Sequence, residues 1–191
     1  PLVTTRTITT ADSFEDQYLA CQASDVQALR SEGAVQHDGI FVPLLRDVFV
    51  PLTLDLGASS PGFRALPIES VSELGYSFSI WDFLAKAKDE KTFRQLAILA
   101  WGGYGKTTLL KHIAFRLGTK QPEKEAPQLV PFLLVLRKYR TLLAQETPPS
   151  LPELIAEHHV PALAGAAVRE VPADWARTVL SSCRALVMFD G

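Results

Sequence analysis

The segment Ala100-Trp-Gly-Gly-Tyr-Gly-Lys-Thr-Thr108 follows an apolar run, Leu96 to Ala100, and precedes a run with helical periodicity that ends at Gly118. Its three glycines allow a tight turn that brings successive backbone N–H groups close to a polyphosphate. The helix that follows presents the positive end of its dipole to the same charge. Strand, glycine-rich loop and helix in this order predict a phosphate-binding loop.

Each polar position of this loop has an expected role. We expect Lys106, the candidate catalytic residue, to contact the β- and γ-phosphate oxygens, and Thr107 to place its hydroxyl on Mg²⁺. The usual pattern begins with glycine where this chain has Ala100, which is acceptable only if φ is negative there. A tight strand-to-helix turn without a ligand is the alternative. The predicted nucleotide-binding residues are Gly102, Gly103, Tyr104, Gly105, Lys106, Thr107 and Thr108.

Two aromatic residues of the loop each have two possible roles. Trp101 and Tyr104 either pack near a ribose or base, or cover the edge of the sheet.

The histidines are not expected to form a site. On the helix that follows the loop, His112 lies off the apolar face, which predicts a surface position. His158 and His159 are adjacent and have no cysteine or carboxylate at ligand spacing, so no metal site is expected there.

Two further apolar runs, Val130–Leu136 and Ala185–Phe189, predict buried strands. Helices are expected between them, one opening at Ser150 with Glu153 in a capping box and another over residues 173–182. A similar box, Ser79 with Asp82, predicts a helix before the loop. Strands that alternate with helices predict an α/β fold, a P-loop parallel sheet flanked by helices and joined by right-handed crossovers.

Asp190 directly follows the last apolar run. A phosphate-binding loop holds Mg²⁺ with help from an aspartate at the carboxyl end of a neighbouring strand, so Thr107 and Asp190 are the predicted metal ligands. The alternative is an exposed turn, because Asp-Gly is a common hairpin dipeptide.

The first 60 residues are expected to form an extension and linker before a nucleotide-binding domain over residues 61–191. A helix is predicted to open at a Ser13–Asp16 capping box and to end near Gly33, followed by edge strands over residues 40–56 that Pro43 and Pro51 interrupt. The Gly/Ser/Pro-rich stretch 57–67 is the predicted boundary.

Composition limits the partners. Nineteen Lys and Arg against twenty-one Asp and Glu leave a net charge of −2, so no overall basic field favours nucleic acid. No run reaches the roughly 18 apolar residues of a membrane span. Two distant cysteines, Cys21 and Cys183, indicate reduced thiols and a cytoplasmic location.

Three runs, LAILAWGGYGKTTLLKHIAFRL, LVPFLLVLRKYRTLL and ALVMFDG, together resemble the first half of a NACHT domain, the STAND-class signalling branch of the P-loop ATPases. The bacterial members of this NLR-like family also carry a region similar to VFVPLTLDL before the loop. Further matches are the Leu136-Arg137 step and the terminal Asp190-Gly191. The loop residues that match the family are Gly102, Gly103, Gly105, Lys106, Thr107, Thr108 and Leu109.

The resemblance implies a signalling switch in innate or antiphage defence. ADP would hold a closed monomer, whereas ATP with Mg²⁺ would favour an open state that self-associates, with slow ATP hydrolysis between them. The family's acidic pair after Asp-Gly is missing here, which leaves the chain without the family's expected catalytic acid. Only three of the five core strands that the family implies are predicted, so the sheet is expected to be incomplete at the C-terminus and the chain to be part of a longer protein. A nucleotide-stabilised scaffold without hydrolysis and a conventional P-loop kinase are the alternatives.

Overall fold

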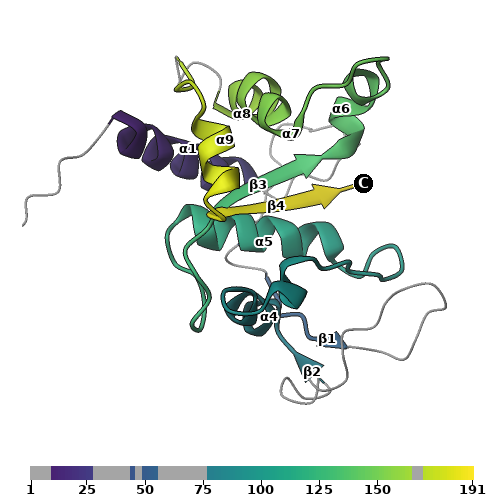
Figure 1. Cartoon of the computed structure of the whole chain (residues 1–191). Coiled ribbons are helices and arrows are strands. Elements are labelled where there is room, and N and C mark those ends of the chain that lie inside the picture. The colour runs from purple at the N-terminus through teal and green to yellow at the C-terminus, as the bar shows by residue number, and fades with distance from the viewer. Residues whose placement is uncertain (1–9, 28–43, 46–48, 56–76, 165–169) are drawn as a thin grey trace, which may run out of the picture.

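The computed structural model describes residues 10–27, 44–45, 49–55, 77–164 and 170–191 (Figure 1). None of the helices in these ranges combines the length and the apolar character needed to span a bilayer. In chain order the elements are α1 (Thr10–Gln27), β1 (Leu54–Asp55), β2 (Ser77–Phe78), α4 (Ile80–Ala87), η1 (Lys91–Arg94), α5 (Lys106–Gly118), β3 (Val130–Val135), α6 (Leu136–Leu143), α7 (Leu151–Glu153), the π-helical turn η2 (Leu154–His159), α8 (Val160–Ala164), α9 (Trp175–Ser181) and β4 (Ala185–Asp190).

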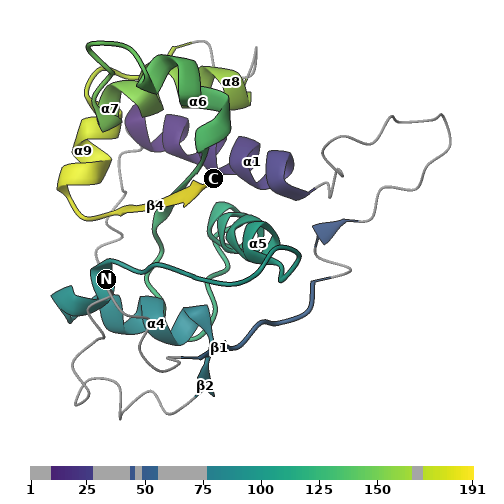
Figure 2. The same cartoon turned by 90° about the vertical axis from the view of Figure 1, so that its right-hand side faces the viewer.

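Strands β3 and β4 form a parallel pair, in register from Val130 opposite Ala185 to Val135 opposite Asp190. Both strands lie where the apolar runs predicted them. Figures 1 and 2 show α5 on one side of the pair and α1, α8 and α9 on the other. The parallel pair between helices agrees with the α/β class at this coarse level.

The side chains of β3 alternate between two cores, as the period of a strand requires. Leu133 packs with Met188 of β4 against the apolar face of α5. Val130 and Phe132 point the other way and pack with residues of α1, η2 and α9, among them Ile155 and Trp175. The strand is therefore buried on both faces.

Two of the three predicted capping boxes, at Ser79 and Ser150, are confirmed. The third is wrong, because Ser13 lies inside α1 and does not cap it. At the start of α4 the backbone N–H of Ser79 donates to the Asp82 carboxylate at 2.9 Å, and the N–H of Asp82 donates to the Ser79 hydroxyl at 3.3 Å. At the start of α7 the N–H of Ser150 donates to Glu153 at 2.7 Å. The helices expected to end at Gly118 and to cover residues 173–182 are present as α5 and α9.

The buried strand predicted over Leu96–Ala100 is wrong. These residues are extended but have no ladder partner among the described residues, and Leu96 and Leu99 are exposed. Only Ile98 reaches the core beneath them, and it is partly buried. An apolar run favours a strand, but a strand forms only beside another chain segment that takes its backbone hydrogen bonds.

Helix α1 extends further toward the N-terminus than its predicted cap. Ser13 lies inside the helix, because the sequence Thr-Ala-Asp before it contains no helix breaker. The predicted end near Gly33, the linker 57–67 and the domain boundary at residue 60 lie outside the described residues. Of the predicted edge strands over 40–56, the described part contains β1, which pairs antiparallel with β2.

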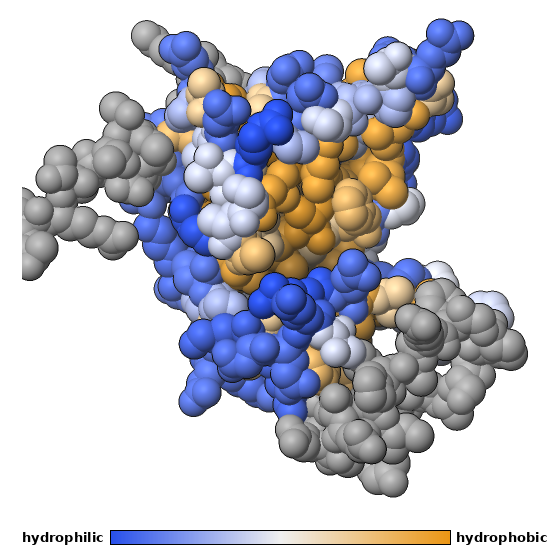
Figure 3. All heavy atoms as spheres, viewed as in Figure 1, coloured by the Kyte–Doolittle hydropathy of each residue, from blue (hydrophilic) through white to orange (hydrophobic). Residues whose placement is uncertain are grey.

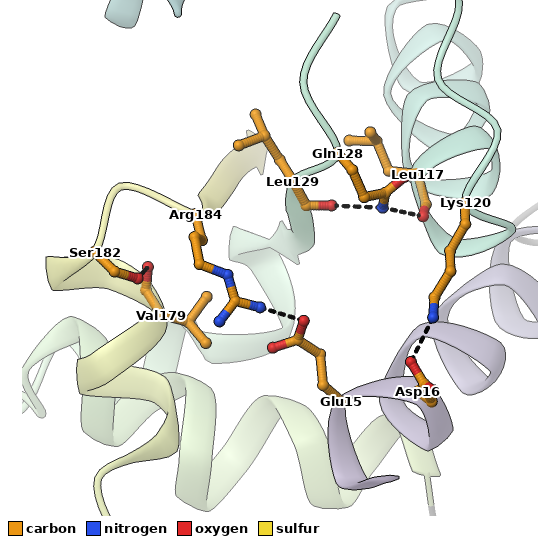
Figure 4. A network of polar contacts seen from close by, with 9 residues as sticks. All are labelled: Glu15, Asp16, Leu117, Lys120, Gln128, Leu129, Val179, Ser182 and Arg184. Carbon is orange, nitrogen blue, oxygen red and sulfur yellow. Dashed lines mark hydrogen bonds and ion pairs between the residues drawn. The ribbon is translucent and has the colours of Figure 1, made fainter. Parts of the chain in front are cut away.

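Helix α1 is fixed against the core at three places. Figure 4 shows two ion pairs, Lys120 with Asp16 at 2.6 Å and Arg184 with Glu15. About one turn further along, α1 crosses the end of α5 so closely that a Cβ on Gly118 would lie 2.9 Å from the carbonyl oxygen of Leu19. Only glycine permits this approach.

The Tyr18 hydroxyl also donates to the carbonyl oxygen of Pro131 at 2.7 Å. Pro131 is in β3 and has no N–H to offer to another strand. Helix α1 therefore takes up one backbone acceptor at the outer edge of β3. The opposite edge of the sheet, along β4, pairs with no other described strand.

Candidate phosphate-binding loop and metal site

The loop before α5 turns through two glycines with positive φ, Gly103 at 83° and Gly105 at 80°. Gly105 is the N-cap of α5, and its carbonyl oxygen accepts the N–H of Leu109 at 2.8 Å. Left-handed backbone at two positions is the geometry that lets successive N–H groups point to one side. Ala100 is not among the residues with positive φ, so the alanine at the first position of the pattern is accommodated.

The ammonium group of Lys106 lies over the loop. Its Nζ donates to the carbonyl oxygen of Ala100 at 2.6 Å and to that of Trp101 at 2.9 Å. These bonds hold the cation beside the backbone of the loop, at the first turn of α5. A positive side chain and the positive end of a helix dipole thus act on the same space.

Thr107 and Asp190 meet at the carboxyl end of the sheet. The Thr107 hydroxyl lies 3.0 Å from each carboxylate oxygen of Asp190, although the two residues are 83 positions apart. Asp190 ends β4 and is 8% exposed. The structure therefore brings together the two residues that the sequence predicted as metal ligands.

Of the remaining predicted residues, Gly102 and Tyr104 are exposed in the loop. Gly102 has open space where a Cβ would be, and Thr108 is half-buried in the first turn of α5. Trp101 and Tyr104 are 80% and 66% exposed. A side chain that covered the edge of the sheet would be buried, so the described structure disfavours that role for both aromatic residues.

Comparison with protein-family models, with curated proteins and with solved structures gave no match for this chain. The assignment of the loop consequently depends on its own geometry and on the resemblance in its sequence.

An apolar surface lies along strand β4. Figure 3 shows apolar side chains gathered across the middle of the face on which Figure 1 places β3 and β4. Phe189 of β4 is 55% exposed, and Leu186 and Val187 are half-buried. The sequence predicted a buried strand over Ala185–Phe189, which holds for Met188 at 6% exposure but not for Phe189.

A buried polar network that the sequence did not predict joins α1 to α6 and η2. Tyr18 and His159 are 0% and 5% exposed. His159 Nε2 lies 3.3 Å from the Tyr18 hydroxyl, and its Nδ1 lies 3.2 Å from the Tyr139 hydroxyl. Since the Tyr18 hydrogen goes to Pro131, a neutral imidazole with its proton on Nε2 satisfies both ring nitrogens.

Burial sets the protonation of this network. It lowers the pKa of His159 from its usual 6.5 to about 4, with a smaller effect from the charge of Lys138. Burial also raises the pKa of Tyr18 well above its ordinary value, and the neighbouring Tyr139 adds to this. Tyr18 and His159 lie 141 positions apart in the sequence, so no local pattern could have paired them. Among the described residues, no three or more His, Cys, Asp and Glu side chains gather into a group that could hold a metal ion.

The predicted surface position of His112 is wrong. Its ring is 8% exposed and stacks on Phe49, with the ring centroids 3.6 Å apart and the planes 5° from parallel. Burial, helped by Arg116, lowers the pKa of His112, whereas Glu123 at 3.5 Å opposes the shift. The side of α5 away from the sheet is covered by residues 49–55 and α4, which the helical pattern of α5 alone does not reveal.

Proposed function

We propose that this chain is the nucleotide-binding part of a P-loop ATPase of the NACHT, or STAND, class. The single observation that carries the proposal is the contact between Thr107 and Asp190 beside the glycine-rich loop. A strand-to-helix turn without a ligand gives no reason for a threonine hydroxyl at the start of α5 to meet a buried carboxylate from the end of β4. A nucleotide with Mg²⁺ needs both groups at this place.

In this proposal the nucleotide is ATP or ADP, and the loop holds its phosphates. Lys106 contacts the β- and γ-phosphate oxygens, and the N–H groups of residues 103–108 surround them. Tyr104, largely exposed in the loop, lies where it can contact the nucleotide without leaving a core.

The residues at the end of β4 fit Mg²⁺. Thr107 and Asp190 offer hydroxyl and carboxylate oxygens, the hard donors that Mg²⁺ selects, and Mg²⁺ takes one or two protein ligands together with phosphates and water. When bound, the ion would neutralise charge on the phosphate oxygens. The hydroxyl of Thr107 and the carboxylate of Asp190 would hold it there.

The wider role follows from the resemblance to NACHT domains. ADP keeps the protein closed, and ATP with Mg²⁺ favours an open state that self-associates, with slow hydrolysis of the β–γ bond. A cytoplasmic signalling protein, in innate or antiphage defence, is the setting this class implies.

Isothermal titration calorimetry with ATP and ADP, with and without Mg²⁺, tests binding, and Lys106→Ala is the matching variant. Phosphate release then tests the mode of action. Slow release supports the switch, no release supports a nucleotide-stabilised scaffold, and fast turnover that needs an acceptor supports a kinase.

A further inference from the structure

The segment Phe49–Leu52, which we call the strap, lies along the first two turns of α5. Its Phe49 stacks on His112 with ring centroids 3.6 Å apart, and its Leu52 Cδ1 lies 3.3 Å from the position a Cβ on Gly105 would take. Gly105 and His112 are seven residues apart on α5, about 10 Å of helix. Phe49 and Leu52 are three residues apart, about 10 Å of extended chain. The strap thus runs antiparallel to the helix and matches the length of these two turns.

The strap is held at both ends. Before it, the N–H of Phe49 donates to the carbonyl oxygen of Leu45 at 3.0 Å, and Leu45 is fully buried. After it, Leu54 enters β1, which pairs with β2. Within it, Pro51 fixes one φ angle. These restraints limit how far Leu52 can move from the loop.

Only some side chains of the strap point toward the core. Phe49 and Leu52 pack against the core cluster that contains Trp81 and Ile113, whereas Val50 between them is 72% exposed. Trp81 also places its ring edge toward His112, with centroids 6.4 Å apart. The aromatic side chains of Phe49 and Trp81 therefore hold His112, and through it the strap is fixed to α5.

Leu52 occupies the space beside the one glycine on which the loop turns into the helix. Gly105 has φ of 80° and caps α5, so its conformation sets the direction of the N–H groups that follow it. Glycine is free to leave a left-handed conformation unless its surroundings prevent it. The Leu52 Cδ1 methyl group, 3.3 Å from where a Cβ on Gly105 would lie, fills the space on that side of the glycine and limits that freedom.

We propose that Leu52 is a positioning residue, anchored by Phe49, that keeps Gly105 left-handed and so holds the loop ready for phosphate. This inference rests on the proposed nucleotide binding. A loop held in its bound conformation binds more tightly, because less conformational entropy is lost when the ligand arrives.

The test compares variants of the full chain by calorimetry with ATP and Mg²⁺. We expect Leu52→Ala to raise Kd about tenfold, and Phe49→Leu, which removes the stack but keeps an apolar side chain, to raise it about threefold. Leu52→Met, which conserves volume, should restore the wild-type Kd. Val50→Ala, in the same segment but exposed, should leave Kd unchanged.

A second measurement separates positioning from loss of stability. Val179→Ala deletes two buried methyl groups from the other core cluster, away from the strap, and so lowers stability without touching the loop. Hydrogen exchange of the amides of residues 101–108 should become faster in Leu52→Ala and not in Val179→Ala. If Leu52→Ala unfolds, Leu52→Val provides the same comparison.

The outcomes distinguish this inference from the function on which it rests. Wild-type Kd and exchange in Leu52→Ala, with binding lost in Lys106→Ala, would overturn the positioning role and leave nucleotide binding in place. An equal rise of Kd in Val179→Ala would also overturn it. No nucleotide binding by the wild-type chain would overturn the proposed function itself.

Discussion

The Thr107 hydroxyl lies 3.0 Å from both carboxylate oxygens of Asp190. One residue opens α5 and the other closes β4, so the contact depends on the parallel order that places both at the carboxyl end of the sheet. It is the point at which the sequence motif and the tertiary structure agree most closely.

Replacing either partner should remove the effect of Mg²⁺ on ATP binding. Thr107→Ala deletes the hydroxyl, and Asp190→Asn deletes the charge while it keeps the shape, so each should weaken ATP binding in Mg²⁺ about tenfold. Calorimetry in the presence and absence of Mg²⁺ is the measurement. Thr107→Ser retains the hydroxyl and should bind as the wild type does. Equal affinities of Thr107→Ala and wild type in Mg²⁺ would argue against the metal role.

Stability should depend on pH through His159. In the unfolded chain His159 is protonated below its usual pKa of 6.5, whereas in the folded chain it stays neutral down to about pH 4. The free energy of unfolding should therefore fall by up to about 3 kcal/mol as the pH drops from 6.5 to 4.

Urea unfolding of the wild type and of His159→Gln at several pH values measures this term. The variant has no imidazole at this position, so its stability should change less over that range. His158→Gln is the matched control, because His158 lies next to His159 but outside the bonds to Tyr18 and Tyr139. A pH profile of His159→Gln identical to that of the wild type would contradict the prediction.

Gly118→Ala should destabilise the protein even though alanine favours helices. A Cβ there would lie 2.9 Å from the carbonyl oxygen of Leu19 and 3.1 Å from the Cβ of Ala23. The gain in helix propensity is about 1 kcal/mol, whereas overpacking costs about 1–3 kcal/mol, so α1 should loosen. Gly102→Ala, where a Cβ meets nothing within 4 Å, is the control and should keep its stability. Thermal unfolding of both variants tests this, and a Gly118→Ala protein more stable than wild type would refute it.

Short sequence patterns correctly predicted several helices and strands. The capping boxes at Ser79 and Ser150, the helix after the loop and the two apolar strands are all present. Each depends on residues a few positions apart, which a sequence displays directly. The pairing of Thr107 with Asp190 was also predictable, because parallel strands end at one edge of a sheet.

What the sequence could not supply depends on distant neighbours. The run 96–100 has strand composition but no ladder partner among the described residues, and β4 keeps an exposed face at Phe189. His112 is buried because Phe49 covers it, and Tyr18 reaches Pro131 from another element. Burial and pairing of this kind follow from tertiary packing, and neither period nor propensity encodes it.

The central claim is that the loop before α5 binds a nucleoside polyphosphate through Lys106. Calorimetric titration of ATP with Mg²⁺ into the wild-type chain and into Lys106→Ala tests it most directly, with circular dichroism to show that both are folded. We expect saturable binding to the wild type and none to the variant, with little change in the melting temperature. Equal ATP affinity of the two proteins, or no binding to a folded wild type, would contradict it.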